Sequence, residues 1–254
     1  MVRGIKAWFP DSTSQYIDSL EALLEGVSRI ISAKTKRFRS KCSAITAYGD
    51  AFELITQPTE QIAIIIDEAH RFFPTRIGAD KDQLDITVLH ETSPGEWDFL
   101  ATSNHTWTRV SPNSIMEGPS LAKKCLTSGE CCFIPDKRLA SEQGCYILSD
   151  RDRSHGVVGS AYCAPLAFRI GTANYRYLVT FSTYGARICE VGDKETGNNA
   201  KHLFDEFVKR IELELLLNSI KTHKHTLKRN PNEVSAATLR TPKDATAKPT
   251  ADKP

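Results

Sequence analysis

Seven cysteines carry the most reactive side chains of this chain, so thiol chemistry is the first possibility to weigh. Their number is odd, no two form a Cys-x-x-Cys pair, and no two histidines stand three to five residues apart, so a structural zinc site is not expected. Reduced thiols that act as small apolar side chains are the ordinary interpretation. The cysteines are Cys42, Cys125, Cys131, Cys132, Cys145, Cys163 and Cys189.

Cys131 and Cys132 are adjacent, which suggests a redox pair. A reactive thiol needs a pKa lowered by a helix N-terminus or a nearby cation, whereas these two residues open an apolar, strand-like stretch after a helix-like segment. Because neighbouring side chains of a strand point to opposite faces, one thiol should face the core and the other should face away. Structural thiols are therefore favoured over a redox pair.

The string IIIDEAH, which ends at His70, copies the letters of a DEAH helicase and of a Walker B strand. Such an enzyme also needs a glycine-rich GxxxxGK[ST] loop to cradle the phosphates, and no such loop precedes the string. A helical apolar period runs without a break over residues 62–73. We therefore expect a helix without nucleotide chemistry, with Asp67 and Glu68 directed away from its apolar stripe.

Among the elements that must position any site, the first is an amphipathic helix near the N-terminus. Ser12 and Gln15 suit a capping box, and apolar residues then recur at spacings of three and four over residues 16–31. A basic run follows over residues 34–41. Since no aromatic interleaving or nucleic-acid-reading motif accompanies this run, we interpret it as a solvated helix face and expect no nucleic-acid partner.

Two more helical patterns follow before the sequence changes character. One covers residues 38–55 and stops before Pro58, and the next covers residues 62–73 and is expected to end at Pro74. Residues 1–57 are therefore predicted to form a helical segment that precedes the main domain.

After Pro74 the period of the apolar residues changes from helical to alternating. Alternation over residues 84–88 and 97–101, with Ser93-Pro94-Gly95 between them, predicts a β-hairpin. Further strands should be separated by turns at two later glycines. These strands cover residues 131–134, 159–168 and 175–181, with a further candidate over 187–191, and the turns lie at Gly171 and Gly185.

A final helix over residues 199–220 has one continuous apolar side and leads into a basic tail. Residues 221–254 carry a net charge of +5, against −3 for the rest of the chain, and few large apolar side chains. They cannot bury enough surface to offset the entropy of ordering, so we expect them to be disordered. Residues 58–220 then form the main domain.

The composition is that of an ordinary globular protein. With 254 residues and 40% hydrophobic side chains, the chain can build a packed core. No apolar run approaches the roughly 18 residues of a membrane helix, and the first residues lack the apolar stretch of a signal peptide. We therefore expect a cytoplasmic protein without a membrane partner.

The order of these elements resembles that of the GAF domain family over about residues 59–220. The resemblance implies an α+β fold of GAF/PAS-like type, in which a central antiparallel sheet has helices packed on one face and follows the N-terminal helical segment. The parts that correspond are the helix Thr59–Phe73, the hairpin Leu84–Ala101, the short helix Ser120–Gly129, the strand and Asp loop Cys131–Asp136, the strand Ser160–Leu166 with its Ala164-Pro165-Leu166 end, the strand Tyr175–Phe181 and the final helix Asn199–Ile220.

In that family a ligand pocket lies between the sheet and the segment that corresponds to residues 136–159. This segment is long and polar, and binding residues concentrate on such connections over a rigid sheet. One face of the following strand would form the floor, either Ser160 with Tyr162 or Ala161 with Cys163. The candidate ligand-binding residues are Asp136, Tyr146, Asp150, Arg153, His155, Ser160 and Tyr162.

Individual branches of the family fit less well. Cyclic-nucleotide-binding GAF domains carry Asn-Lys, Phe and Asp-Glu signatures, and the corresponding residue types are here compressed into residues 199–206. Free methionine sulfoxide reductases use pocket cysteines, for which Cys145 is the candidate, but their Gly-Val-Cys-Gly segment is absent. An attachment cysteine in the context required by bilin photoreceptors is absent as well.

The resemblance implies a non-catalytic sensory module that binds an unidentified small molecule and has no metal or cofactor of its own. Signals would pass through a homodimer formed by the N- and C-terminal helices to an unidentified output protein, as in a multi-protein bacterial system. Two alternatives stay open. One is a thiol-dependent reductase of the free methionine sulfoxide reductase type that uses Cys145 with Cys125 or Cys132, and the other is a ligand-free adaptor whose pocket is filled by Trp97 or Phe133.

Overall fold

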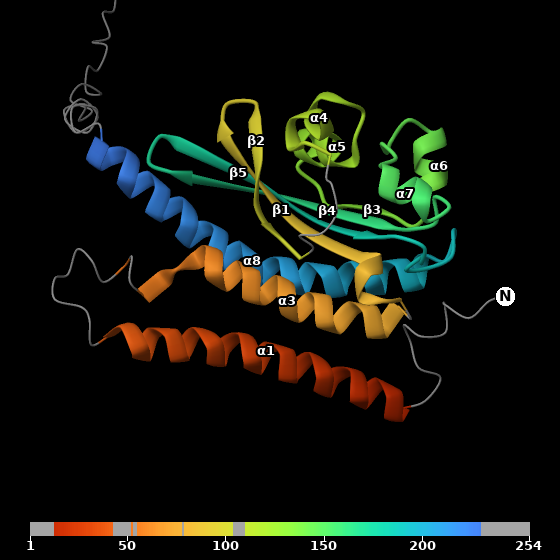
Figure 1. The fold of residues 1–254 in the computed structure, drawn as a ribbon, viewed down its shortest axis with the longest axis horizontal. Coiled ribbons are helices and arrows are strands. Elements are labelled where there is room, and N and C mark those ends of the chain that lie inside the picture. Colours follow the sequence, from red (N-terminus) through yellow and green to blue (C-terminus); the bar gives the residue numbers. More distant parts are fainter. Residues whose placement is uncertain (1–12, 43–51, 53–54, 78, 104–109, 230–254) are drawn as a thin grey trace, which may run out of the picture.

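A computed structural model describes residues 13–42, 52, 55–77, 79–103 and 110–229 and has an α+β fold built on an open, five-stranded antiparallel sheet with strand order β2-β1-β5-β4-β3 (Figure 1). The α+β class and the antiparallel sheet confirm the expectation from the sequence. The strands are β1 Leu84–Ser93, β2 Glu96–Thr102, β3 Cys132–Ile134, β4 Ala161–Ile170 and β5 Ala173–Thr183.

The predicted hairpin is present as β1 and β2, and Gly95 in its turn has a φ of +84°, a conformation that costs a glycine little. The turn between β4 and β5 contains Gly171, as expected. The prediction of a strand over residues 187–191 is wrong. That segment leaves the sheet, and its Ile188 N–H donates to the side chain of Ser160 instead of to a neighbouring strand.

Long helices form a layer against one face of the sheet (Figure 1). Helices α3 and α8 pack on the sheet, and α1 lies outside them against α3. An aromatic cluster joins this layer to the sheet, since the ring of Phe73 contacts those of Phe181 and Phe204 at centroid distances of 5.6 and 4.6 Å. The helices are α1 Thr13–Cys42, α3 Pro58–Ile77 and α8 Lys194–Arg229.

All three long helices extend beyond the expected bounds. Helix α1 continues through the basic run, α3 passes through Pro74, and α8 runs nine residues beyond Ile220. Pro74 has no N–H to donate to the carbonyl of His70, so the last turn of α3 forms with one helical hydrogen bond fewer. Of the helix expected over 38–55, residues 43–51 and 53–54 lie outside the described part of the chain, as do residues 230–254 of the expected tail.

Ion pairs attach α1 to the two helices beneath it. Glu68, the glutamate of IIIDEAH, is buried and accepts from Arg29 Nε of α1 at 2.9 Å. Lys34 pairs with the buried Glu214 of α8. Asp67 is exposed as expected, whereas Glu68 is not, because α1 covers that side of α3. The string is helical, so it cannot serve as a Walker B strand.

Four short helices cover part of the opposite face (Figure 1). Each starts at a serine or aspartate whose side chain accepts a backbone N–H of the first turn, and Gly129 ends α5 with a left-handed φ of +71°. Two of these helices lie within the connection over 136–159. The short helices are α4 Pro112–Glu117, α5 Leu121–Ser128, α6 Lys137–Glu142 and α7 Asp150–Ser154.

In the described part of the chain, no helix combines the length and the apolarity needed to cross a membrane.

Candidate functional site

A cavity of about 260 Å³ lies between the sheet and its covering of short helices. Its size is close to the lower end of the range of small-molecule sites, roughly 300 to 1,000 Å³. The described residues that line it come from β1, β2, β4, β5, α4, α5 and the segment before and within α7. They are Asp85, Thr87, Leu89, Phe99, Val110, Ser114, Ile115, Ser120, Leu121, Ala122, Tyr146, Ile147, Ser149, Arg151, Ala161, Tyr162, Cys163, Thr180, Ser182 and Tyr184.

The floor of the cavity consists of cross-strand rows whose polarity changes along the sheet. One row carries a carboxylate and a hydroxyl, the next carries two hydroxyls and a thiol, and the third is apolar. In order from β1 across β5 to β4, the rows are Asp85, Ser182 and Ala161; Thr87, Thr180 and Cys163; and Leu89, Leu178 and Pro165, and of this third row Leu89 is the member that lines the cavity. The cavity therefore has a polar end and an apolar end.

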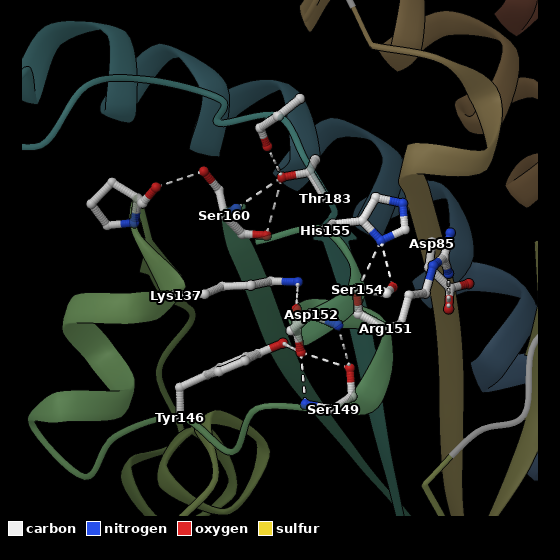
Figure 2. Close-up of polar contacts among 12 residues, drawn as sticks. Asp85, Lys137, Tyr146, Ser149, Arg151, Asp152, Ser154, His155, Ser160 and Thr183 are labelled. Atoms are coloured by element: carbon white, nitrogen blue, oxygen red, sulfur yellow. Dashed lines mark hydrogen bonds and ion pairs between the residues drawn. The ribbon is translucent and has the colours of Figure 1, made fainter. Parts of the chain in front are cut away.

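Arg151 of α7 meets Asp85 of β1 at the polar end (Figure 2). The arginine Nη1 lies 3.4 Å from the Asp85 Oδ2, and both side chains are buried, at 6% and 9% exposure. The guanidinium also donates to the carbonyl of Asp82 and lies 4.0 Å above the ring of Tyr184. These contacts hold a positive and a negative group side by side at the cavity wall.

A second buried ion pair supports this end from behind. Lys137 Nζ donates to Asp152 Oδ1 at 2.7 Å, with side-chain exposures of 0% and 1%. The other carboxylate oxygen of Asp152 accepts from the N–H and hydroxyl of Ser149 and from the hydroxyl of Tyr146, as Figure 2 shows. Asp152 therefore fixes the segment that forms one wall of the cavity.

Burial controls the titration of this region. It lowers the pKa of Lys137 to about 8, although pairing with Asp152 acts in the opposite direction. Burial likewise raises the pKa of Tyr146 and of Tyr184, which keeps both phenols protonated at neutral pH. The phenols can therefore donate hydrogen bonds inside the site.

Of the seven residues expected to bind a ligand, Tyr146 and Tyr162 line the cavity. Tyr146 does so from the segment before α7. The side chain of Tyr162 leaves the cavity for the helical face, where its ring stacks on Phe204 and its hydroxyl donates to Asp205. The floor on β4 is thus the second of the two alternatives, Ala161 with Cys163.

Asp136 and Ser160 are buried and hold the connection in place. Asp136 caps α6 by accepting the Leu139 N–H at 3.1 Å and pairs with Arg187. The hydroxyl of Ser160 donates to the carbonyl of Pro135 at 2.7 Å. Both residues support the fold near the site and do not line it.

Asp150, Arg153 and His155 lie on the outer side of the connection. The carboxylate of Asp150 is fully exposed and pairs with Arg153 at 2.8 Å. The Nδ1 of His155 lies 2.9 Å from the carbonyl of Arg151 and 3.0 Å from the hydroxyl of Ser154. None of the three is among the described residues that line the cavity.

Sequence reasoning missed most of the polar lining. Asp85 and Thr87 are the polar residues of the alternation over 84–88 and were not singled out as site residues, yet both are buried beside the cavity. One signal could have found them. The hairpin that contains this strand is followed by long segments that hold α4 to α7 and cover that face, so its polar side chains point into a covered space. The missed polar residues are Asp85, Thr87, Ser114, Ser120, Ser149, Arg151, Thr180, Ser182 and Tyr184.

Three thiols cluster beside the cavity. Cys163 lines it, and the Cys125 Sγ lies 3.6 Å from the Cys163 carbonyl, with Cys132 opposite Cys163 in the ladder. Burial raises the pKa of Cys163, whereas hydrogen bonding with Cys163 lowers that of Cys125 to about 7. Cys145 is partly buried beside α5 and is not among the described cavity residues.

The comparisons with known proteins add no relative. No protein-family model matches the chain, and no curated protein matches it. Among the described residues, no group of three or more His, Cys, Asp or Glu side chains is placed to hold a metal ion.

Proposed function

We propose that this protein is a GAF-like sensory module that binds a small molecule in the cavity and signals without catalysis. The observation that carries the proposal is the placement of buried charges and hydroxyls on the floor of a cavity between the sheet and the short helices. Burying such groups costs free energy unless they are paired, and a purely structural sheet face would be expected to carry apolar side chains instead. A bound ligand is a reason to keep them.

The arrangement of the layers supports the same proposal. The long helices pack on one face of the sheet and leave the other face to the short, helix-rich connection, as the resemblance to GAF domains implies. A change in the occupancy of the cavity would act on β1, β5 and β4, which also carry the helical layer. The sheet thereby links the cavity to α8.

A thermal-shift panel of amino acids, small carboxylic acids, cyclic nucleotides and tetrapyrroles tests ligand binding. A ligand at about 100 times its dissociation constant should stabilise the wild type by roughly 2.7 kcal/mol. Ala122→Leu places extra atoms in the cavity and should abolish the shift. Ala167→Leu, on an exposed part of β4, is the matched control and should keep it. A panel that shifts nothing would contradict the proposal.

The output step is proposed to use a homodimer formed through α1 and α8. Leu24 and Ile31 of α1 are exposed at 66% and 60%, and Leu213, Leu216 and Ile220 form an exposed stripe on α8. Large apolar side chains gathered in this way are typical of interaction surfaces. The dimer would present α8 to an unidentified output protein.

Sedimentation equilibrium tests the assembly. Leu213→Ser with Leu216→Ser should weaken the dimer by about tenfold or more, since two interface side chains lose roughly 1 to 2 kcal/mol each. Glu212→Ser, an exposed change on the same helix, should leave the dimer unchanged. A protein that stays monomeric at all concentrations would refute this part of the proposal.

Thiol-dependent reduction remains a second candidate because Cys163 lines the cavity and the pKa of Cys125 is lowered. The partner thiol expected from the sequence, Cys145, lies outside that cluster. Timed alkylation followed by mass spectrometry separates the two functions. A thiol enzyme requires a cysteine that reacts rapidly near neutral pH, and uniformly slow labelling would support the non-catalytic module.

The ligand-free adaptor finds less support. Its cavity was expected to be filled by Trp97 or Phe133, yet neither residue is among the described residues lining the cavity. Phe133 packs against the core on the helical side, and Trp97 lines a separate surface depression.

A further inference from the structure

The charges at the cavity wall restrict what the cavity can hold. Asp85 and Arg151 are the only Asp, Glu, Lys or Arg side chains among the described residues that line it. The pair behind them, Lys137 and Asp152, is also neutral in sum. A ligand with a net charge would therefore add an uncompensated charge to a buried region, which costs several kcal/mol. A ligand whose own charges cancel avoids this cost.

The geometry of the pair suits a head group with two opposite charges. The distance of 3.4 Å between Arg151 Nη1 and Asp85 Oδ2 exceeds the roughly 2.7 to 2.9 Å of a close charged hydrogen bond. A carboxylate that approaches Arg151 and an ammonium that approaches Asp85 would each gain a charged partner. The hydroxyl of Ser182 lies at the same end of the cavity and can bond to a remaining polar atom of the head group.

The opposite end is suited to an apolar group. Residues two apart on a strand are separated by about 6.6 to 6.8 Å, so the apolar row at Leu89 lies roughly 13 Å from the charged row. The hydroxyl row of Thr87 and Thr180 lies between them, and these two hydroxyls hydrogen-bond to each other. Phe99, Ile115 and Leu121 close the apolar end.

We propose that the cavity takes a small zwitterion with an apolar side chain, such as an apolar α-amino acid, with its carboxylate on Arg151, its ammonium on Asp85 and its side chain toward Leu89. This inference rests on the proposed function, because it names the ligand class of the same cavity. It predicts that the affinity of a ligand depends more on whether it carries both charges than on the shape of its side chain.

Isothermal titration of the full chain with three matched probes tests the charge rule. L-Phenylalanine carries both charges, 3-phenylpropanoate lacks the ammonium, and 2-phenylethylamine lacks the carboxylate. The zwitterion should bind at least tenfold more tightly than either partner. Equal or tighter binding of a singly charged probe would overturn the inference. The same comparison with L-leucine, 4-methylpentanoate and 3-methylbutylamine guards against a side chain that does not fit.

Two charge variants then test the assigned residues. Asp85→Asn should shift the preference toward the anionic probe, and Arg151→Gln should shift it toward the cationic probe, each by about tenfold, with folding checked by circular dichroism. Asp150→Asn removes an exposed carboxylate nearby and should leave the preference unchanged. Loss of affinity for all three probes in equal proportion would overturn the assignment of the head group.

Failure of this inference and failure of the proposed function give different results. If none of the six probes binds but another panel compound stabilises the wild type and not Ala122→Leu, the inference of a zwitterionic ligand is refuted and the proposal of a sensory module stands. If no compound of the panel stabilises the wild type, both are refuted.

Discussion

The two faces of the central sheet differ in what they bury. The face toward α3 and α8 carries Ile86, Val88 and Phe181, which pack with aromatic rings of the long helices. The face toward the short helices carries Asp85, Thr87 and other polar side chains around a cavity. Both sets alternate along the same strands, so one strand serves two environments. The difference supports the proposal that one face supplies stability and the other binds a ligand.

This division has a thermodynamic basis. Burying apolar side chains stabilises the folded state simply by removing them from water, so the helical face needs no further partner. Charged and hydroxyl groups gain nothing by burial alone and depend on specific partners. The cavity face therefore contributes less to folding than its buried area suggests. Substitutions on the two faces should separate these contributions.

The largest expected effect comes from the helical face. Phe181→Ala should lower the free energy of unfolding by about 3 to 5 kcal/mol, because it empties space among fully buried rings. Phe99→Ala, at the half-buried rim of the cavity, should cost clearly less. Urea unfolding of both variants measures the difference. Equal losses would remove the distinction between the two faces.

The ion pair behind the cavity should give the next largest effect. Lys137→Met leaves the buried Asp152 carboxylate without its cation and should cost about 3 kcal/mol. Adding Asp152→Asn removes that charge and should recover most of the loss, since the amide oxygen can still accept from Ser149. A double variant that is less stable than the single variant would show that Asp152 acts mainly through other contacts.

A smaller effect concerns pH. Burial lowers the pKa of Lys137 to about 8 from an ordinary value of 10.5, so between these values the unfolded chain binds more protons than the folded chain. The free energy of unfolding of the wild type should rise with pH through this window, by on the order of 1 to 3 kcal/mol, relative to the Lys137→Met/Asp152→Asn variant. This added stability is fully present above pH 10.5, where Lys137 is neutral in both the folded and the unfolded chain. It is lost as the pH falls from 10.5 through 8. Parallel stability curves for the two proteins would contradict this assignment.

The elements of the fold could largely be predicted because their signals are local. Alternation over β1 and β2 with a turn at Gly95, and a glycine at residue 129 that ends α5, depend only on neighbouring residues. The strand predicted over 187–191 is absent because Ile188 is buried in the core on the helical side and donates its N–H to the Ser160 side chain instead of joining the ladder. The helices α6 and α7 were missed because each is only one to two turns long.

The site was harder to predict because it depends on which side of each strand is covered. Alternation pairs Ser160 with Tyr162 and Ala161 with Cys163, but it does not say which pair faces the cavity. Ion pairs such as that between Arg151 and Asp85 join residues far apart in the chain, and no local spacing reveals them. Of the expected residues, Tyr146 alone directs its side chain to the cavity region, through its contact with Asp152.

Neighbouring residues of β1 offer the most direct test of the central claim. Thr87 faces the cavity and Val88 faces the helices. Val88→Ala should lower the melting temperature by several degrees, about 2 to 4 °C per kcal/mol lost, and keep the ligand-induced rise of the wild type. Thr87→Val should melt within a degree or two of the wild type and change that rise. The measurement is the melting temperature of both variants with and without the panel compound that stabilises the wild type most. An equal change of the ligand-induced rise in both variants, or no change in either, would contradict the division between a stabilising face and a binding face.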